Sequence, residues 1–362
     1  MTDDHQELRA LLAELGVQSR DLEPRPGEAE RAERDLALIL GEARDEAERP
    51  SHIRRAARPL LLLAVAAVLA IGLVVARPFT GSDSALAQTP AVLQIQDGGE
   101  SVIDAADTPA AEELLRLADL AGAAPPPADG PVQLIVRDSW LLKTDEETGK
   151  APATSVLVPV HSQQYFQPDG TIRTIERTGR PLGSDGQLTD TKGSWDDRPA
   201  ESDETFQGPE TGPEYPSTLS SDPAELAEQL VPDPEGCAES YTYCLVVAMN
   251  FLHYNHVLEP GLAATLLSML AQRDDIRFAG LSTDRLGRTA DAFVAPGSNA
   301  SRAIIVLFDP EIGAFLGSEE VLVEDSPELG LDAPAVVEFT ALEESRRIAA
   351  SDVPDESLTT RY

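Results

Sequence analysis

The longest apolar run in the chain is Leu60–Ala76, where 17 consecutive residues carry no charged or polar side chain. As a helix that rises about 1.5 Å per residue, the run spans roughly 26 Å, slightly less than a bilayer core of about 30 Å. Arg58 and Arg77 flank the run, and their side chains can extend to the headgroups. We therefore expect one transmembrane helix over residues 59–76, because a soluble core helix of this length ordinarily carries polar residues.

The basic residues close to this run are concentrated on its N-terminal side. Arg54, Arg55 and Arg58 precede it, whereas only Arg77 follows closely. Positive residues favour the cytoplasmic side of a membrane, so we expect a cell-membrane protein with a cytoplasmic N-terminus and an extracytoplasmic C-terminal domain. Signal-peptide cleavage after Ala87 is the alternative, although residues 1–58 are too long an n-region for a typical signal peptide.

Residues 1–58 form the expected cytosolic segment. Leu8, Leu11, Leu12 and Leu15 recur with helical spacing and share one face. A segment this polar cannot bury a core by itself. We expect short helices that either dock on a cytosolic protein partner or stay solvated.

Residues 77–106 are rich in small and polar residues, which predicts a juxtamembrane linker. Thr108 is a suitable N-cap for a helix that ends before the prolines at 125–127. After these prolines, apolar residues recur at every second position and no longer with helical spacing, which is typical of half-buried strands. Strands are predicted over 132–142, 156–160 and 171–176.

An acidic, loop-rich insertion is predicted over residues 179–222, which hold ten acidic and three basic residues. Helices should follow from Asp222, over 239–253, and from Pro260. Further strands are predicted over 276–278, 290–294, 303–308, 314–323 and 335–342. This order of strands, helices and strands predicts an α+β domain with a mostly antiparallel sheet over 107–345, followed by a C-terminal tail at 346–362.

The net charge limits the kinds of partner. There are 63 acidic and 28 basic residues, which give a formal charge of −35. A nucleic-acid-binding protein would need a basic face, so no nucleic-acid partner is expected. Residues 77–362 hold 49 acidic and 18 basic residues, a net charge of −31. Such a domain repels anionic headgroups within the screening length and favours a cationic or neutral apolar partner.

The chain contains two cysteines, Cys237 and Cys244, separated by seven positions. Outside the membrane the compartment is oxidising, so a disulfide is the simplest expectation. The spacing is not that of a redox-active Cys-x-x-Cys pair. A zinc site would need two more ligands nearby.

Other candidate sites have weaker patterns. His253, His256 and Glu259 lie at spacings that can hold a metal, but they lack the His-Glu-x-x-His frame. Asp309–Gly313 combines Asp-Pro with a later glycine, which favours a turn between two strands. Neither a nucleophile elbow nor a phosphate-binding glycine loop is present. We therefore expect no catalytic residues, no metal and no cofactor, and we expect that the protein is not an enzyme.

Two motifs in the last third of the chain carry a resemblance: Asp284–Arg288, which reads DRLGR, and Leu307–Gly317, which reads LFDPEIGAFLG. With the single span, they make the chain from about residue 50 onward resemble an uncharacterised, locus-tag-named family of actinobacterial single-pass membrane proteins. The second motif is similar to strand–turn–strand units of the lipoprotein-carrier fold and of periplasmic sensors that restrain sigma-factor regulators. The resemblance implies a curved antiparallel sheet covered by helices, and it supplies no catalytic residues.

Two functions remain from the sequence. The first is a non-enzymatic extracytoplasmic sensor or regulator, anti-sigma-like, that couples the outer domain to a cytosolic partner of residues 1–58. The second is a tethered envelope protein that binds a lipid or another hydrophobic ligand in a groove between the sheet and its helices.

Overall fold

The computed structural model describes residues 89–96, 98–145, 154–179, 200–207, 219–237, 240–327 and 329–354. All of them belong to one compact unit. In these ranges, no helix has both the length and the apolar character needed to cross a membrane. The expected transmembrane helix at 59–76, the cytosolic segment 1–58 and Ala87 lie outside the described residues.

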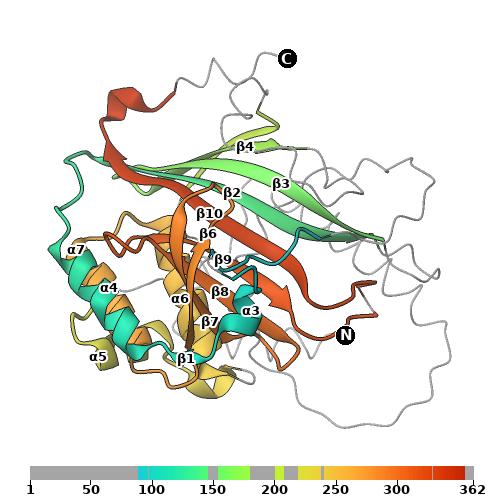
Figure 1. Cartoon of the computed structure of the whole chain (residues 1–362). Coiled ribbons are helices and arrows are strands. Elements are labelled where there is room, and N and C mark those ends of the chain that lie inside the picture. Colours follow the sequence, from blue (N-terminus) through green and yellow to red (C-terminus); the bar gives the residue numbers. More distant parts are fainter. Residues whose placement is uncertain are drawn as a thin grey trace, which may run out of the picture. The chain divides into compact units, whose positions relative to one another are not determined.

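A single antiparallel sheet of ten strands organises the described residues (Figure 1). Its spatial order is β1-β6-β7-β8-β9-β10-β2-β3-β4-β5, so two meanders, β2–β5 and β6–β10, meet where β10 pairs with β2. This arrangement confirms the α+β class and the antiparallel sheet. The strands are β1 (Thr108–Pro109), β2 (Val132–Asp145), β3 (Thr154–Phe166), β4 (Thr171–Thr178), β5 (Ser202–Gln207), β6 (Arg277–Thr283), β7 (Thr289–Pro296), β8 (Arg302–Phe308), β9 (Phe315–Leu322) and β10 (Ala335–Ile348).

The helices begin where local capping chemistry allows. They are α3 (Val102–Ala105), α4 (Ala111–Ala123), α5 (Pro223–Leu230), α6 (Tyr241–Asn255) and α7 (Pro260–Leu270). Asp222 caps α5 as predicted, because its Oδ1 accepts hydrogen bonds from the backbone N–H groups of residues 224 and 225 at 2.9 and 3.0 Å. Ser240 caps α6 through the backbone N–H of Tyr243 at 3.2 Å.

The predicted start of α4 was wrong by a few residues. Thr108 does not cap this helix, because Thr108 and Pro109 pair with Phe278 and Arg277 of β6 as strand β1. The helix begins at Ala111 without a side-chain cap. Pairing with the sheet therefore overrides the local N-cap preference.

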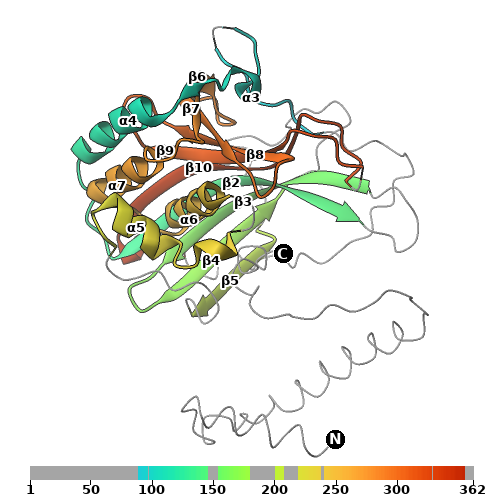
Figure 2. The same cartoon turned by 90° about the horizontal axis from the view of Figure 1, so that it is seen from below.

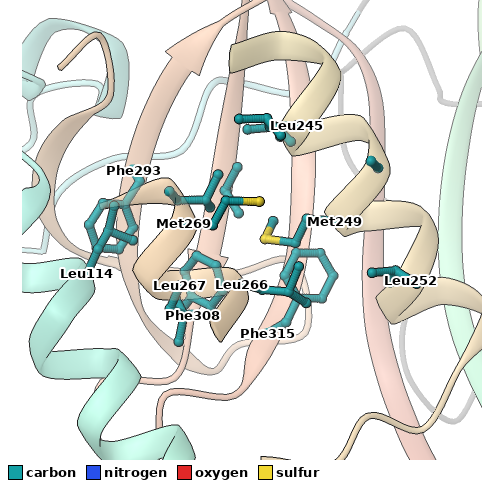
Figure 3. Packing of buried hydrophobic residues seen from close by; sticks show 14 of the residues in the cluster. Leu114, Leu245, Met249, Leu252, Leu266, Leu267, Met269, Phe293, Phe308 and Phe315 are labelled. Carbon is teal, nitrogen blue, oxygen red and sulfur yellow. The ribbon is translucent and has the colours of Figure 1, made fainter. Parts of the chain in front are cut away.

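Helices α4–α7 cover one face of the sheet, and their side chains fill the space between the two layers (Figures 2 and 3). Leu114, Met249 and Leu266 meet Phe293 and Phe308, and each of these side chains is at most 1% exposed. Phe293 and Phe308 contact each other edge to face at a centroid distance of 5.9 Å. This interface, where a ligand groove was one expectation, is packed core.

The opposite face of the sheet carries a second apolar cluster that includes the start of the described chain. Val92, Leu93 and Val102 are buried against strand residues such as Ile305 and Leu307. The Gln96 backbone N–H donates to the Leu281 carbonyl at 2.9 Å. Within the juxtamembrane linker predicted over 77–106, the described residues from 89 onward therefore pack on the sheet through their few apolar side chains.

Two other predicted boundaries also move. The expected loop-rich insertion at 179–222 contains β5, which pairs along its length with β4. The expected tail at 346–362 begins inside β10, where Ile348 is 3% exposed and pairs with Val132. In both places, backbone pairing with a neighbouring strand extends the sheet beyond the predicted boundary.

Candidate functional site

The predicted disulfide is present. Cys237 is bonded to Cys244 with a Cα–Cα distance of 5.9 Å. Cys237 is buried, and Cys244 packs against the same apolar cluster. The bond links the segment after α5 to the first turn of α6.

An open hollow of about 440 Å³ is lined in part by Pro234 and Tyr241, each three residues before one of these cysteines. Its walls come from the end of α5, the following segment and the start of α6. The Arg273 guanidinium lies 5.4 Å from the centre of the Tyr241 ring and holds the ring at the edge of the hollow. The residues that line the hollow are Glu228, Val231, Pro232, Pro234 and Tyr241. Its surface is therefore mainly apolar, with one carboxylate.

His253 and His256, the weak metal-ligand candidates of the sequence, each stack on an aromatic ring. The His253 ring stacks on Phe315 at 4.4 Å, and burial lowers its pKa to about 3. His256 stacks on Phe166 at 6.4 Å, and burial lowers its pKa as well. Glu259 instead receives a hydrogen bond from Arg347 at 3.0 Å. His253 is thus a neutral core residue.

The Asp309–Gly313 segment forms the predicted turn between β8 and β9. Asp309 Oδ1 accepts hydrogen bonds from the backbone N–H groups of Glu311 and Ile312 at 2.8 and 3.2 Å. The Gly313 N–H donates to the Asp309 carbonyl at 2.9 Å, with φ at +67°. The acidic side chain of Asp309 therefore stabilises the turn.

The other resemblance motif, Asp284–Arg288, forms the β6–β7 turn and crosslinks the sheet. Arg288 donates to Asp284 Oδ2 at 2.7 Å and to the Leu342 carbonyl at 2.8 Å. Arg285 makes two 2.7 Å hydrogen bonds to the carboxylate of Glu319, whose side chain is 1% exposed. Burial raises the pKa of Glu319, and the Arg285 guanidinium opposes that shift. Both motifs thus have structural roles in the described residues.

A cluster that the sequence did not reveal lies on the sheet face opposite the helices. Asp138 of β2, His161 of β3 and Glu343 of β10 each offer one possible metal-ligand atom, and these atoms all lie within 4.8 Å of one another. The His161 Nδ1 and Asp138 Oδ1 atoms are 2.7 Å apart. Asp138 is 4% exposed and His161 is 5% exposed. The alternation of β2 places Asp138 on the face of Val136 and Trp140, which was the only available signal.

Glu338 is a partly buried acidic residue that the sequence did not mark. Burial and, to a smaller extent, the nearby Glu320 carboxylate raise its pKa to about 7, although Arg302 and Arg137 act in the opposite direction. It lies on β10 opposite Leu141 of β2. Its protonation therefore changes near neutral pH.

Comparison with known proteins gives only distant similarities. No protein family and no curated protein matches the chain. A solved complex of Pseudomonas aeruginosa MucA/MucB is similar over 70% of this chain and 61% of that chain, with 13% identity and a TM-score of 0.22. A crystal structure of MucB in complex with MucA(peri) is similar over 70% and 60%, with 14% identity and a TM-score of 0.21. The chain thus spans about three fifths of those chains, and similarity at this TM-score does not establish a common fold.

Proposed function

We propose that the chain is a single-pass membrane protein whose extracytoplasmic domain is a non-enzymatic sensor or regulator that binds a protein partner. In this proposal, binding of the partner to the extracytoplasmic domain is signalled through residues 1–58 to a cytosolic protein, as in an anti-sigma-like regulator. The observation that carries the proposal is the Cys237–Cys244 disulfide, whose neighbours in the sequence line the open hollow. The disulfide is typical of an oxidising compartment, and the hollow offers a surface for recognition.

The chemistry of the hollow favours one kind of partner. Val231, Pro232 and Tyr241 offer apolar surface, whereas Glu228 adds a carboxylate. The whole chain carries a net charge of −35, which attracts positive segments over short distances. A partner segment with an apolar side chain flanked by lysine or arginine fits these properties.

The alternative, a bound hydrophobic ligand, is supported by the same hollow. Its volume of about 440 Å³ lies within the range of roughly 300–1,000 Å³ that is common for ligand sites. The packed interface between α4–α7 and the sheet offers no comparable support among the described side chains. A small ligand would therefore bind near Tyr241.

Site-specific photocrosslinking in intact cells tests the partner. A crosslinking residue at position 241 should yield one saturable protein adduct, and Glu228→Arg should reduce it severalfold by reversing the local charge. The same residue at position 281 is the control, because Leu281 is 40% exposed on β6. Equal adducts at both positions would reject the hollow as the binding site, and a small-molecule adduct would favour the alternative.

A reporter fused after Tyr362 tests the topology. We expect activity from a reporter that works only outside the cytoplasm and none from a cytoplasmic one. The opposite result would reject the extracytoplasmic placement independently of any partner.

A further inference from the structure

The Asp138–His161–Glu343 cluster combines three side chains from three adjacent strands. Sheet pairing fixes two of them, because Asp138 lies directly opposite His161 in the β2–β3 register. Directly opposed residues on neighbouring antiparallel strands point to the same face. The positions of Asp138 and His161 are therefore set by the rigid part of the fold.

A bulge in β10 supplies the third residue. Leu342 pairs with Arg137 and Glu344 pairs with Val136, so Glu343 is the extra residue between them. A bulge of this kind redirects a side chain and is frequent next to binding sites. Glu343 lies at this bulge, and its carboxylate is within 4.8 Å of the ligand atoms of Asp138 and His161.

The donor atoms match one class of ligand. One imidazole nitrogen and two carboxylate oxygens are a common protein contribution to zinc and related divalent cations, with water at the remaining position. Ligand atoms about 2.1 Å from a tetrahedral ion lie roughly 3.4 Å apart. The Asp138–His161 separation of 2.7 Å and the 4.8 Å limit for the cluster bracket that distance. The separations of the ligand atoms would have to change by at most about 1.4 Å.

We infer that Asp138, His161 and Glu343 form a binding site for one divalent cation of the zinc class. Two carboxylates contribute negative charge to the site, and Arg177, directly opposite His161 on β4, lies on the same face and contributes one positive charge. A divalent cation would therefore compete with the Arg177 guanidinium for these carboxylates. The cation would replace the proton shared by His161 and Asp138. It would also connect β10, β2 and β3 at the junction of the two meanders.

Metal titration of the purified full chain tests this inference. After chelator treatment and desalting, zinc should bind with a stoichiometry of one per chain in competition with a chromophoric chelator. Cobalt should give the visible absorption of a low-coordinate site with mixed nitrogen and oxygen ligands. Zinc should also raise the melting temperature, because only the folded state holds the three ligands together.

Matched variants separate this site from the other histidines. His161→Gln should abolish the binding of one zinc per chain, the cobalt absorption and the zinc-induced rise in melting temperature. His256→Gln should leave all three unchanged. If His161→Gln fails to fold, Asp138→Asn keeps the side-chain volume and should show the same loss. Absence of zinc binding to the native chain, or full binding by folded His161→Gln, would overturn the inference. Neither result depends on the proposed partner-binding function.

Discussion

Replacing Gly313 with alanine probes how closely the β8–β9 turn approaches helix α4. The residue has a φ of +67°, and a Cβ atom there would lie 2.4 Å from the Leu117 carbonyl oxygen and 3.0 Å from the Ala121 nitrogen. Both of these are backbone atoms of α4 and cannot rotate away. Left-handed backbone strain costs about 1–2 kcal/mol for alanine, and forced overpacking adds about 1–3 kcal/mol.

Gly287→Ala is the matched control. Gly287 also lies in a hairpin turn with positive φ, +80°, but a Cβ atom added there would have no other atom within 4 Å beyond its chain neighbours. Gly287→Ala should therefore lower the free energy of unfolding only by the backbone strain of about 1–2 kcal/mol. The difference between the two variants isolates the contact between the turn and the helix.

Denaturant unfolding of the full chain, followed by far-ultraviolet circular dichroism, measures both free energies. We expect Gly313→Ala to be less stable than Gly287→Ala by about 1–3 kcal/mol, or roughly 2–12 °C in melting temperature. Equal destabilisation of the two variants would refute the reasoning, because it would mean that the turn does not press against α4.

Three further predictions concern stability. Reduction of Cys237–Cys244, or its replacement by serines, should cost about 2–3 kcal/mol for so short a loop; an unchanged melting temperature in reductant would contradict this. Arg285→Met should lower the free energy of unfolding by about 3–5 kcal/mol, because it leaves the buried Glu319 carboxylate without its charge partner. Adding Glu319→Gln should restore most of the lost stability in thermal melts, and no recovery would argue against this cause. The folded-state pKa of Glu338 is raised to about 7 from 4.5, so the free energy of unfolding should fall by about 3 kcal/mol as the pH rises from about 4.5 to 7. In unfolding curves measured across this pH range, Glu338→Gln should remove most of that fall. An unchanged pH dependence in the variant would exclude Glu338 as its source.

Local signals were sufficient for most of the elements. Asp222 and Pro223 marked the start of α5, and the alternation of Val132 and Leu134 marked β2, because capping and period-two burial act over a few residues. The packing of the described residues between 89 and 106 on the sheet was not predicted, because only a few short apolar side chains anchor them. Their burial depends on a sheet surface that is formed by distant parts of the chain.

The cluster of Asp138, His161 and Glu343 depends on register, which composition does not encode. A shift of one residue between β2 and β3 would move His161 to the other face. The bulge that places Glu343 arises in the pairing of β10 with β2. The disulfide could be predicted because it needed only two cysteines in one short segment.

The pairing of β10 with β2 has a consequence for how the chain is made. The N-terminal meander appears early in synthesis, yet its β2 edge receives its partner only when residues 335–348 have emerged. Until then β2 and β9 each present an unpaired edge, which can join other chains. Closure over so long a chain separation is slow compared with hairpin formation. A chain that ends before residue 335 would therefore contain two meanders without the strand that joins them, and should be prone to aggregation and to degradation by quality-control proteases.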